Sequence, residues 1–148
     1  MPAARADAGE ILTLQLACWV QEAHANDTLA IPPLHEGADD VVASLGAWDT
    51  YVVRSAGRLV GSVRGRLVGT EWEIGRLMVA PDLQGRGLGR QLLEHIQRVA
   101  PPEATSYLLL TGDRSVRNQR LYKRAGFRVH GPQPDLAGVR NLRKPRRS

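Results

Sequence analysis

A strand that runs into a glycine-rich turn and then into a helix is the feature that most limits how this chain can fold. Residues 71–80 read as a strand, the stretch from Gln84 to Gly89 contains three glycines, and an apolar helical repeat starts at Leu88. Glycine accepts a positive φ and lets a ligand approach the backbone closely. The first turn of a helix has unpaired N–H groups and a positive dipole end. The segment therefore predicts a site for an anion such as a phosphate group.

The spacing of these glycines excludes two common phosphate-binding loops. A dinucleotide fingerprint that starts at Gly85 would need a glycine at position 90, where the chain has Arg90. A P-loop needs Gly-Lys followed by Ser or Thr, and the segment has no such triplet. What remains is Gln-x-x-Gly-x-Gly behind a strand that ends in Leu-Met-Val-Ala-Pro. A tight turn that needs glycine but binds no ligand is the alternative interpretation.

The periodicity of the other segments predicts a mixed sheet with helices on its faces, an α/β fold. The Val- and Leu-rich segments 50–55 and 58–68 form a hairpin around Ala56–Gly57. Asp7 and Glu10 form a capping box for a helix to Ala25, whose Leu12, Leu16 and Trp19 face the core. The other expected elements are a short strand 2–6, a loop 26–37, helices 38–45 and 88–100, a strand 106–111, a helix that Ser115 caps and Gly126 ends, and strands 127–130 and 139–143.

The strand, the turn and the helix together resemble the acetyl-CoA-binding motif of the GNAT family of N-acetyltransferases. The resemblance extends over nearly the whole chain. It implies a mixed sheet of about six or seven strands and about four helices, in which strands four and five splay apart around the pantetheine arm. On this model, segment 71–80 is the fourth strand and segment 106–111 is the fifth.

The resemblance also implies which groups bind the cofactor, acetyl-CoA. Backbone groups of Leu77, Met78 and Val79 would pair with pantetheine, and one N–H would polarise the acetyl carbonyl. Arg86 and Arg90 would add positive charge near the diphosphate. The backbone N–H groups that would hold the diphosphate belong to Gln84, Gly85, Arg86, Gly87, Leu88, Gly89 and Arg90.

A second cofactor motif is suggested by a helical face late in the chain. Asn118, Leu121, Tyr122 and Ala125 are spaced to share that face, and the run 118–127 resembles the family's second motif. There Asn118 would bond to pantetheine, and the Tyr122 hydroxyl would lie near the thioester sulfur. Aminolysis expels a thiolate, which a phenol with a pKa near 10 can protonate. The alternative is a half-buried aromatic residue whose hydroxyl lies in water.

The attacking amine must lose a proton, because a lysine-like amine has a pKa of about 10.4. Glu73 is the leading candidate base, since strict alternation puts it on the same side as Leu77 and Val79 unless a bulge intervenes. A glutamate at this spacing acts as base in the histone-acetylating branch of the family. The alternative for Glu73 is an ion pair across the hairpin with Arg64 or Arg66.

The acceptor is predicted to be an amine on a small molecule or on a protein. Glu71 is a second candidate base. By resemblance, the loop 24–37 walls the acceptor pocket, where Asp27, His35 and Glu36 are candidate binding residues. The four His residues and single Cys show no metal-ligand spacing, so no metal is expected.

The length and composition of the chain indicate its number of domains and its location in the cell. The length of 148 residues suits one domain, with residues 143–148 as a mobile basic tail. No apolar run approaches the roughly 18 residues that span a membrane. Residues 1–10 have no apolar core of signal-peptide type, so export is not expected, and the single Cys18 suits a reducing cytoplasm.

The net charge of +5 suits either a nucleic acid or an anionic cofactor. Nucleic acid is the weaker candidate, because the chain has no aromatic-rich stacking surface. A homodimer is possible. The prediction is therefore a cytoplasmic N-acetyltransferase whose amine attacks acetyl-CoA directly in a ternary complex. The alternative is a catalytically silent acyl-CoA-binding module on the same fold.

Overall fold

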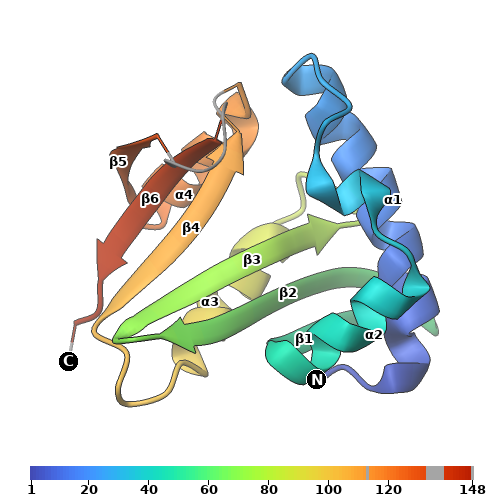
Figure 1. Cartoon of the computed structure of the whole chain (residues 1–148), viewed down its shortest axis with the longest axis horizontal. Coiled ribbons are helices and arrows are strands. Elements are labelled where there is room, and N and C mark those ends of the chain that lie inside the picture. Colours follow the sequence, from blue (N-terminus) through green and yellow to red (C-terminus); the bar gives the residue numbers. More distant parts are fainter. Residues whose placement is uncertain (113, 133–138, 148) are drawn as a thin grey trace.

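The computed structural model describes residues 1–112, 114–132 and 139–147 (Figure 1). Four α-helices are present in this part: α1 (Ala8–Ala25), α2 (Ala38–Ala47), α3 (Leu88–Arg98) and α4 (Val116–Arg124). The strands are β1 (Asp49–Ser55), β2 (Arg58–Val68), β3 (Glu71–Val79), β4 (Ser106–Gly112), β5 (Arg128–Pro132) and β6 (Val139–Pro145). Short 3₁₀ turns cover Arg5–Asp7, Pro32–His35 and Pro81–Leu83.

The strands form one mixed sheet in the order β1-β2-β3-β4-β6-β5. Only the β3–β4 pairing is parallel among these neighbours, and β1 and β2 make the predicted hairpin. The mixed α/β fold and its helix count are thus confirmed. The expected strand 2–6 was wrong: Pro2 makes a single bridge to Tyr51, and the chain then enters the 3₁₀ turn.

The central strands β3 and β4 separate along their length. Their register runs from Glu71 opposite Ser106 to Ile74 opposite Leu109 and then stops. Figure 1 shows the two strands meeting at one end and diverging toward the other. These strands are the fourth and fifth of the predicted model, so the expected splay is confirmed. Beyond Ile74, β3 has no strand partner on this side among the described residues.

A bulge in β3 reverses the predicted alternation of its side chains. The register with β2 shifts between Ser62 and Arg64, opposite a residue of β3, Arg76, that has a φ of 49°. Trp72 and Ile74 lie in the same core cluster that Leu77 and Val79 pack against, although strict alternation would put them on opposite faces. The prediction that Glu73 shares a side with Leu77 and Val79 was therefore wrong.

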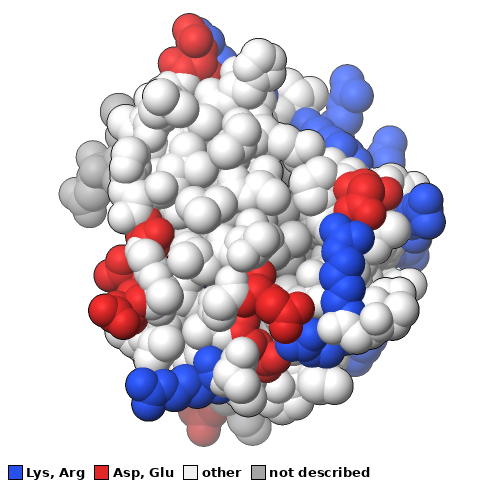
Figure 2. Space-filling model, turned by 90° about the vertical axis from the view of Figure 1, so that its right-hand side faces the viewer, with Lys and Arg blue, Asp and Glu red and all other residues white. Residues whose placement is uncertain are grey.

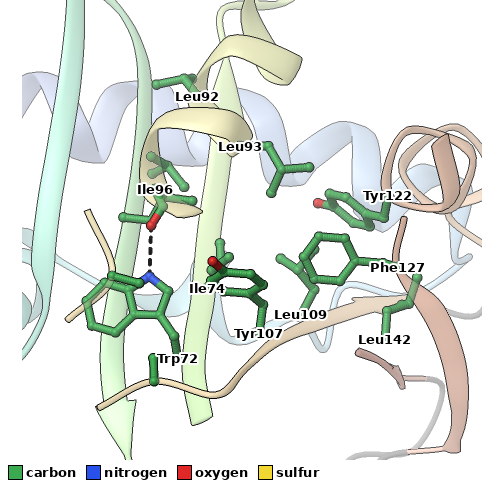
Figure 3. Close-up of a cluster of buried hydrophobic side chains, with 13 residues drawn as sticks. Trp72, Ile74, Leu92, Leu93, Ile96, Tyr107, Leu109, Tyr122, Phe127 and Leu142 are labelled. Carbon is green, nitrogen blue, oxygen red and sulfur yellow. Dashed lines mark hydrogen bonds between the residues drawn. The ribbon is translucent and has the colours of Figure 1, made fainter. Parts of the chain in front are cut away.

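Two apolar clusters hold the sheet between its helices. On the face of α3 and α4, the indole of Trp72 donates to the carbonyl of Ile96 at 3.0 Å (Figure 3). Complete burial of a large apolar side chain contributes roughly 1.5–3 kcal/mol, so such residues dominate the stability of this half. The other face is covered by α1 and α2, with Ile11, Cys18, Val41 and Met78 in its core.

The core-facing side of α1 differs from the predicted one. Its buried residues include Ile11, Leu14, Gln15 and Cys18, while Leu16 is 37% exposed. Figure 2 shows the outer side of the molecule over α1, where the middle is uncharged and charged side chains lie around it. Leu16 and Val20 are apolar but exposed, so apolar residues lie on both sides of the helix and make the sequence pattern ambiguous.

The predicted capping box of α1 was also wrong. The carboxylate of Asp7 accepts a hydrogen bond from the N–H of Ala4 at 2.7 Å and pairs with Arg54 at 2.6 Å. Glu10 pairs with Arg54 at 2.8 Å. Both carboxylates thus bind the charged Arg54 of β1 and do not cap the helix.

The basic C-terminal residues begin inside the sheet. Strand β6 continues to Pro145, and the guanidinium of Arg143 donates to Glu71 at 2.9 Å. Lys144 donates to Gln97 at 2.9 Å. Residues 143–145 therefore belong to a strand, where the sequence predicted a tail.

Candidate active site

A cleft of about 2470 Å³ follows the opening between β3 and β4. It exceeds the roughly 300–1,000 Å³ of pockets for drug-sized ligands, and so offers room for a long ligand. The end of α1, the glycine turn, α3 and α4 complete its walls. Most of the predicted site residues line this cleft: Asp27, Glu73, Leu77, Val79, Gln84, Gly85, Gly87, Leu88, Gly89, Arg90, Asn118 and Tyr122.

The glycine turn adopts the conformation that its sequence predicts. Gly85 and Gly87 have φ values of 79° and 84°, in the left-handed region that side chains disfavour. Helix α3 then starts at Leu88, and the carbonyl of Gly87 accepts the N–H of Gln91 at 3.1 Å. The N–H groups of the first helical turn therefore have no partner within the helix and lie at its positive end.

The side chain of Gln84 links the turn to two helices. Its amide donates to Gln21 of α1 at 3.0 Å, and its carbonyl oxygen accepts a bond from Arg117 of α4 at 2.7 Å. Arg90 pairs with Glu94 one helical turn away, at an exposed position. The turn thus has nearby cations and a fixed position relative to α1 and α4.

Tyr122 lies at the wall of the cleft with only 5% of its surface exposed. Its ring packs edge-on against Phe127, with the centroids 6.4 Å apart (Figure 3). Burial, and after it the negative charge of Glu22, raise the pKa of Tyr122 well above its ordinary value. The phenol is therefore protonated at neutral pH and can serve as a proton donor.

The carboxylate of Glu22 in α1 joins two polar side chains at the same wall. It accepts a hydrogen bond from the amide of Asn118 at 2.8 Å and another from the hydroxyl of Ser115. Asn26 donates to Ser115 at 3.0 Å. Ser115 precedes α4 as predicted, but its hydroxyl makes no cap bond: it donates to Glu22 and accepts the bond from Asn26.

Glu73 borders the cleft on the opposite face of β3 from Leu77 and Val79. Its carboxylate pairs with the guanidinium of Arg66 at 3.0 Å, and 17% of its side chain is exposed. This is the cross-hairpin pair that the sequence offered as the alternative. Glu71 pairs with Arg143 at the closed end of the β3–β4 opening. The role of either residue as a base stays a prediction.

The predicted acceptor residues are separated in the structure. Asp27 lines the cleft, with a φ of 51°. Glu36 forms two hydrogen bonds of 2.9 Å with Arg76, which hold the pKa of its carboxyl below the usual value. The ring of His35 lies 2.8 Å from the carbonyl of Leu29. His35 and Glu36 do not belong to the lining of the cleft among the described residues.

Comparison of the sequence with a family model identifies the family of this chain. The model of the acetyltransferase (GNAT) domain matches residues 47–129, more than half of the chain. The chain belongs to the GNAT acetyltransferase family. This GNAT domain is also 30% identical over 120 residues to the UPF0157 protein YqkA of Bacillus subtilis (strain 168). The match covers 81% of the domain but spans only about a third, 34%, of YqkA.

Solved structures of low sequence identity share the fold of this GNAT domain. The PaiA N-acetyltransferase from Thermoplasma acidophilum, in complex with coenzyme A, has a TM-score of 0.84 at 11% identity, with 97% and 96% of the two chains covered. YncA, a putative acetyltransferase from Salmonella typhimurium with its cofactor acetyl-CoA, has a TM-score of 0.75 at 21% identity, with 98% and 91% covered. An acetyltransferase from Thermus thermophilus has a TM-score of 0.76 at 19% identity, with 98% and 94% covered.

Two more predicted residues of the GNAT domain lie outside the lining of the cleft. The side chain of Met78 is buried against α1 and α2, and Arg86 is exposed on the turn. The predicted role of Met78 concerns its backbone and that of Arg86 its backbone and charge, and both roles stay predictions. Within the described residues, no group of three or more metal-ligating side chains comes together. None of the described helices is long and apolar enough to cross a bilayer.

Sequence reasoning missed Glu22 in this GNAT domain. The buried stripe of α1 runs through Ile11, Leu14 and Cys18, and Glu22 follows Cys18 by four positions on the same face. A carboxylate on an apolar stripe is unusual and calls for partners. The sequence pattern conceals this signal, because its spacing predicts a stripe of Leu12, Leu16 and Trp19 instead.

Proposed function

We propose that the protein transfers an acetyl group from acetyl-CoA to a primary amine by direct attack within a ternary complex. Family membership makes it an acyltransferase. The proposed use of acetyl-CoA is supported by the open edge of β3, which leads to the glycine turn within one cleft. Two proteins of the same fold were solved with coenzyme A and with acetyl-CoA.

The diphosphate of acetyl-CoA would bind where the turn meets α3. The N–H groups of Leu88, Gly89 and Arg90 belong to the first turn of the helix and point out of its end. Gly85 and Gly87 carry no side chain that would keep phosphate oxygens from the backbone. The helix dipole and the arginines of the turn add attraction for the anion.

The pantetheine arm would pair with β3 in place of a neighbouring strand. The edge of β3 from Gly75 to Val79 has no partner on the β4 side among the described residues, and a peptide-like arm can use its N–H and C=O groups. Asn118 and Tyr122 face the same cleft from α4. Binding there would place the thioester between a backbone donor of β3 and the phenol of Tyr122.

In the reaction, the amine nitrogen forms a bond to the acetyl carbon and the carbon–sulfur bond breaks. A backbone N–H of β3 would stabilise the negative charge that develops on the carbonyl oxygen. The phenol of Tyr122 would give its proton to the departing thiolate, and the proton lost by the amine would return to solvent through Glu73 or a water chain. The phenol is suited to this task because it stays protonated at neutral pH.

A thiol-release assay tests this proposal. Acetyl-CoA is mixed with the protein and a panel of amines, and free thiol is followed with time. The proposal expects release that requires both protein and amine. Tight binding of acetyl-CoA without release for any amine would instead support a catalytically silent acyl-CoA-binding module.

A further inference from the structure

Among the described residues, Arg64 of β2 is a cation on the cleft that forms no ion pair with an acidic side chain. It faces the cleft near Trp48, and its Nε is buried without a hydrogen-bond partner among the described residues. The two neighbouring arginines are neutralised: Arg66 pairs with Glu73 at 3.0 Å, and Arg76 pairs with Glu36 at 2.9 Å. The three arginines and two carboxylates therefore leave one positive charge, and it belongs to Arg64.

The surroundings of Arg64 stabilise its position without neutralising its charge. The Cζ atom lies 4.1 Å from the ring centroid of Trp48, whose π face attracts a cation. A cavity of about 10 Å³ beside Thr50 and Arg64 has room for at most one water molecule, which carries no charge to offset that of Arg64. Burial, and after it the charge of Arg76, lower the pKa of Arg64 to about 10. The side chain remains charged at neutral pH, at a cost to folding that an anion would offset.

Arg64 also lies close to the place proposed for the acetyl group. It pairs with Gly75 in the β2–β3 register, and a Cβ on Gly75 would lie 3.7 Å from the Nε of Arg64 and 3.5 Å from the ring of Trp48. Leu77 follows two residues later, across the bulge at Arg76, so its backbone lies within about 7 Å of Gly75 along the strand. A small molecule can span such a distance if a short carbon chain joins its amine to an acid group that accepts a hydrogen bond from the guanidinium.

We infer that the acceptor is a small amine that also carries an acid group, and that Arg64 binds this group beside Trp48. The guanidinium offers paired N–H donors that match a carboxylate or a phosphate-type anion. Asp27 lines the same cleft and is suited to the ammonium end of such an acceptor. Arg64 is thus a specificity-determining residue. The inference rests on the proposed transfer of an acetyl group to an amine.

The direct test compares matched acceptors with the wild-type protein. Thiol release is measured for several amino acids, for their α-amides, and for the corresponding aminophosphonic acids. The acid-bearing amines are expected to exceed their amides in kcat/KM by at least tenfold. Preference for the carboxylates or for the phosphonates identifies the anion. Equal or better use of the amides would overturn the inference, whereas no transfer to any amine would defeat the proposed function itself.

A variant assigns the preference to Arg64. Arg64→Met should lower kcat/KM for the acid-bearing amines at least tenfold, change it for the amides less than threefold, and leave the Kd for acetyl-CoA unchanged. Its melting temperature should not fall, because the variant removes an unpaired, partly buried cation. Arg128→Gln, at an exposed position of β5 outside the cleft lining, controls for net charge and should keep the preference. An equal loss for acids and amides in Arg64→Met would contradict the role of Arg64.

Discussion

The carboxylate of Glu22 accepts a hydrogen bond from the side-chain amide of Asn118 at 2.8 Å and thereby ties α1 to α4 across the wall of the cleft. Glu22 also adds to the raised pKa of Tyr122, after burial. The residue proposed to bind pantetheine and the residue proposed as proton donor are thus coupled through one carboxylate of α1.

Replacing Glu22 by Gln should lower the pKa of Tyr122. The variant removes a negative charge that disfavours the phenolate, but burial, the larger cause, remains. The pKa should therefore stay above its ordinary value of about 10. A pH titration of tyrosinate absorbance measures it, with Tyr122→Phe subtracted to remove the other two tyrosines. A pKa that stays the same or rises would show that Glu22 does not act on Tyr122.

Tyr122→Phe should reduce kcat by roughly 10²-fold or more, because general acid catalysis contributes at least that much. The Kd for acetyl-CoA, measured by calorimetry, should change little, since only a hydroxyl is lost. Tyr107→Phe is the matched control: that tyrosine is also buried, but its hydroxyl bonds to the carbonyl of Gln97 and it does not line the cleft. Full activity in Tyr122→Phe would remove its proposed role.

Gly87→Asp should raise the Kd for coenzyme A at least tenfold, or about 1.4 kcal/mol. The new carboxylate would lie beside the diphosphate at a position with a φ of 84°. Gly87→Asn places a side chain of the same size there without charge, and both Asn and Asp tolerate this φ better than other residues. The Asn variant should therefore bind more tightly than the Asp variant. Equal affinity of the two would mean that no anion binds at the turn.

Glu36→Gln should destabilise the fold at neutral pH by about 1–2 kcal/mol, because Arg76 loses its ionic partner. The pair lowers the pKa of Glu36 in the folded state, so its contribution is full above the unfolded pKa of about 4.3 and is lost as pH falls through the folded value. Urea unfolding should thus separate wild type from variant at pH 7, and the difference should shrink by pH 3.

The exposed Glu103 provides the control for this comparison, and Glu103→Gln should unfold like the wild type at both pH values. A difference between wild type and Glu36→Gln that is the same at pH 7 and pH 3 would contradict the pKa argument.

The sequence predicted the parts of the fold that short-range chemistry determines. The hairpin of β1 and β2, the turn at Gly85 and Gly87, and the start of α3 follow from alternation and from the need for glycine at positive φ. The splay of β3 and β4 was available only through resemblance to a family, because no local pattern shows where two distant strands part.

The errors arose where tertiary contacts overrode local preference. Arg54 binds the carboxylates of Asp7 and Glu10, and the hydroxyl of Ser115 bonds to Glu22 and Asn26, so none of these side chains caps α1 or α4. The bulge at Arg76 puts Leu77 and Val79 on the opposite face of β3 from Glu73, because one extra residue shifts every later side chain. None of these partners is adjacent in sequence, so periodicity could not reveal them.

The most direct test of the central claim is a titration of ¹⁵N-labelled protein, in which backbone amide signals are followed as coenzyme A or pantetheine is added. The account predicts that coenzyme A shifts the signals of Gly85, Gly87 and Gly89 as well as those of Leu77 and Val79, whereas pantetheine, which lacks the diphosphate, shifts those of β3 alone. Binding of coenzyme A that leaves the three glycine signals in place would contradict the assignment of this turn as the diphosphate site.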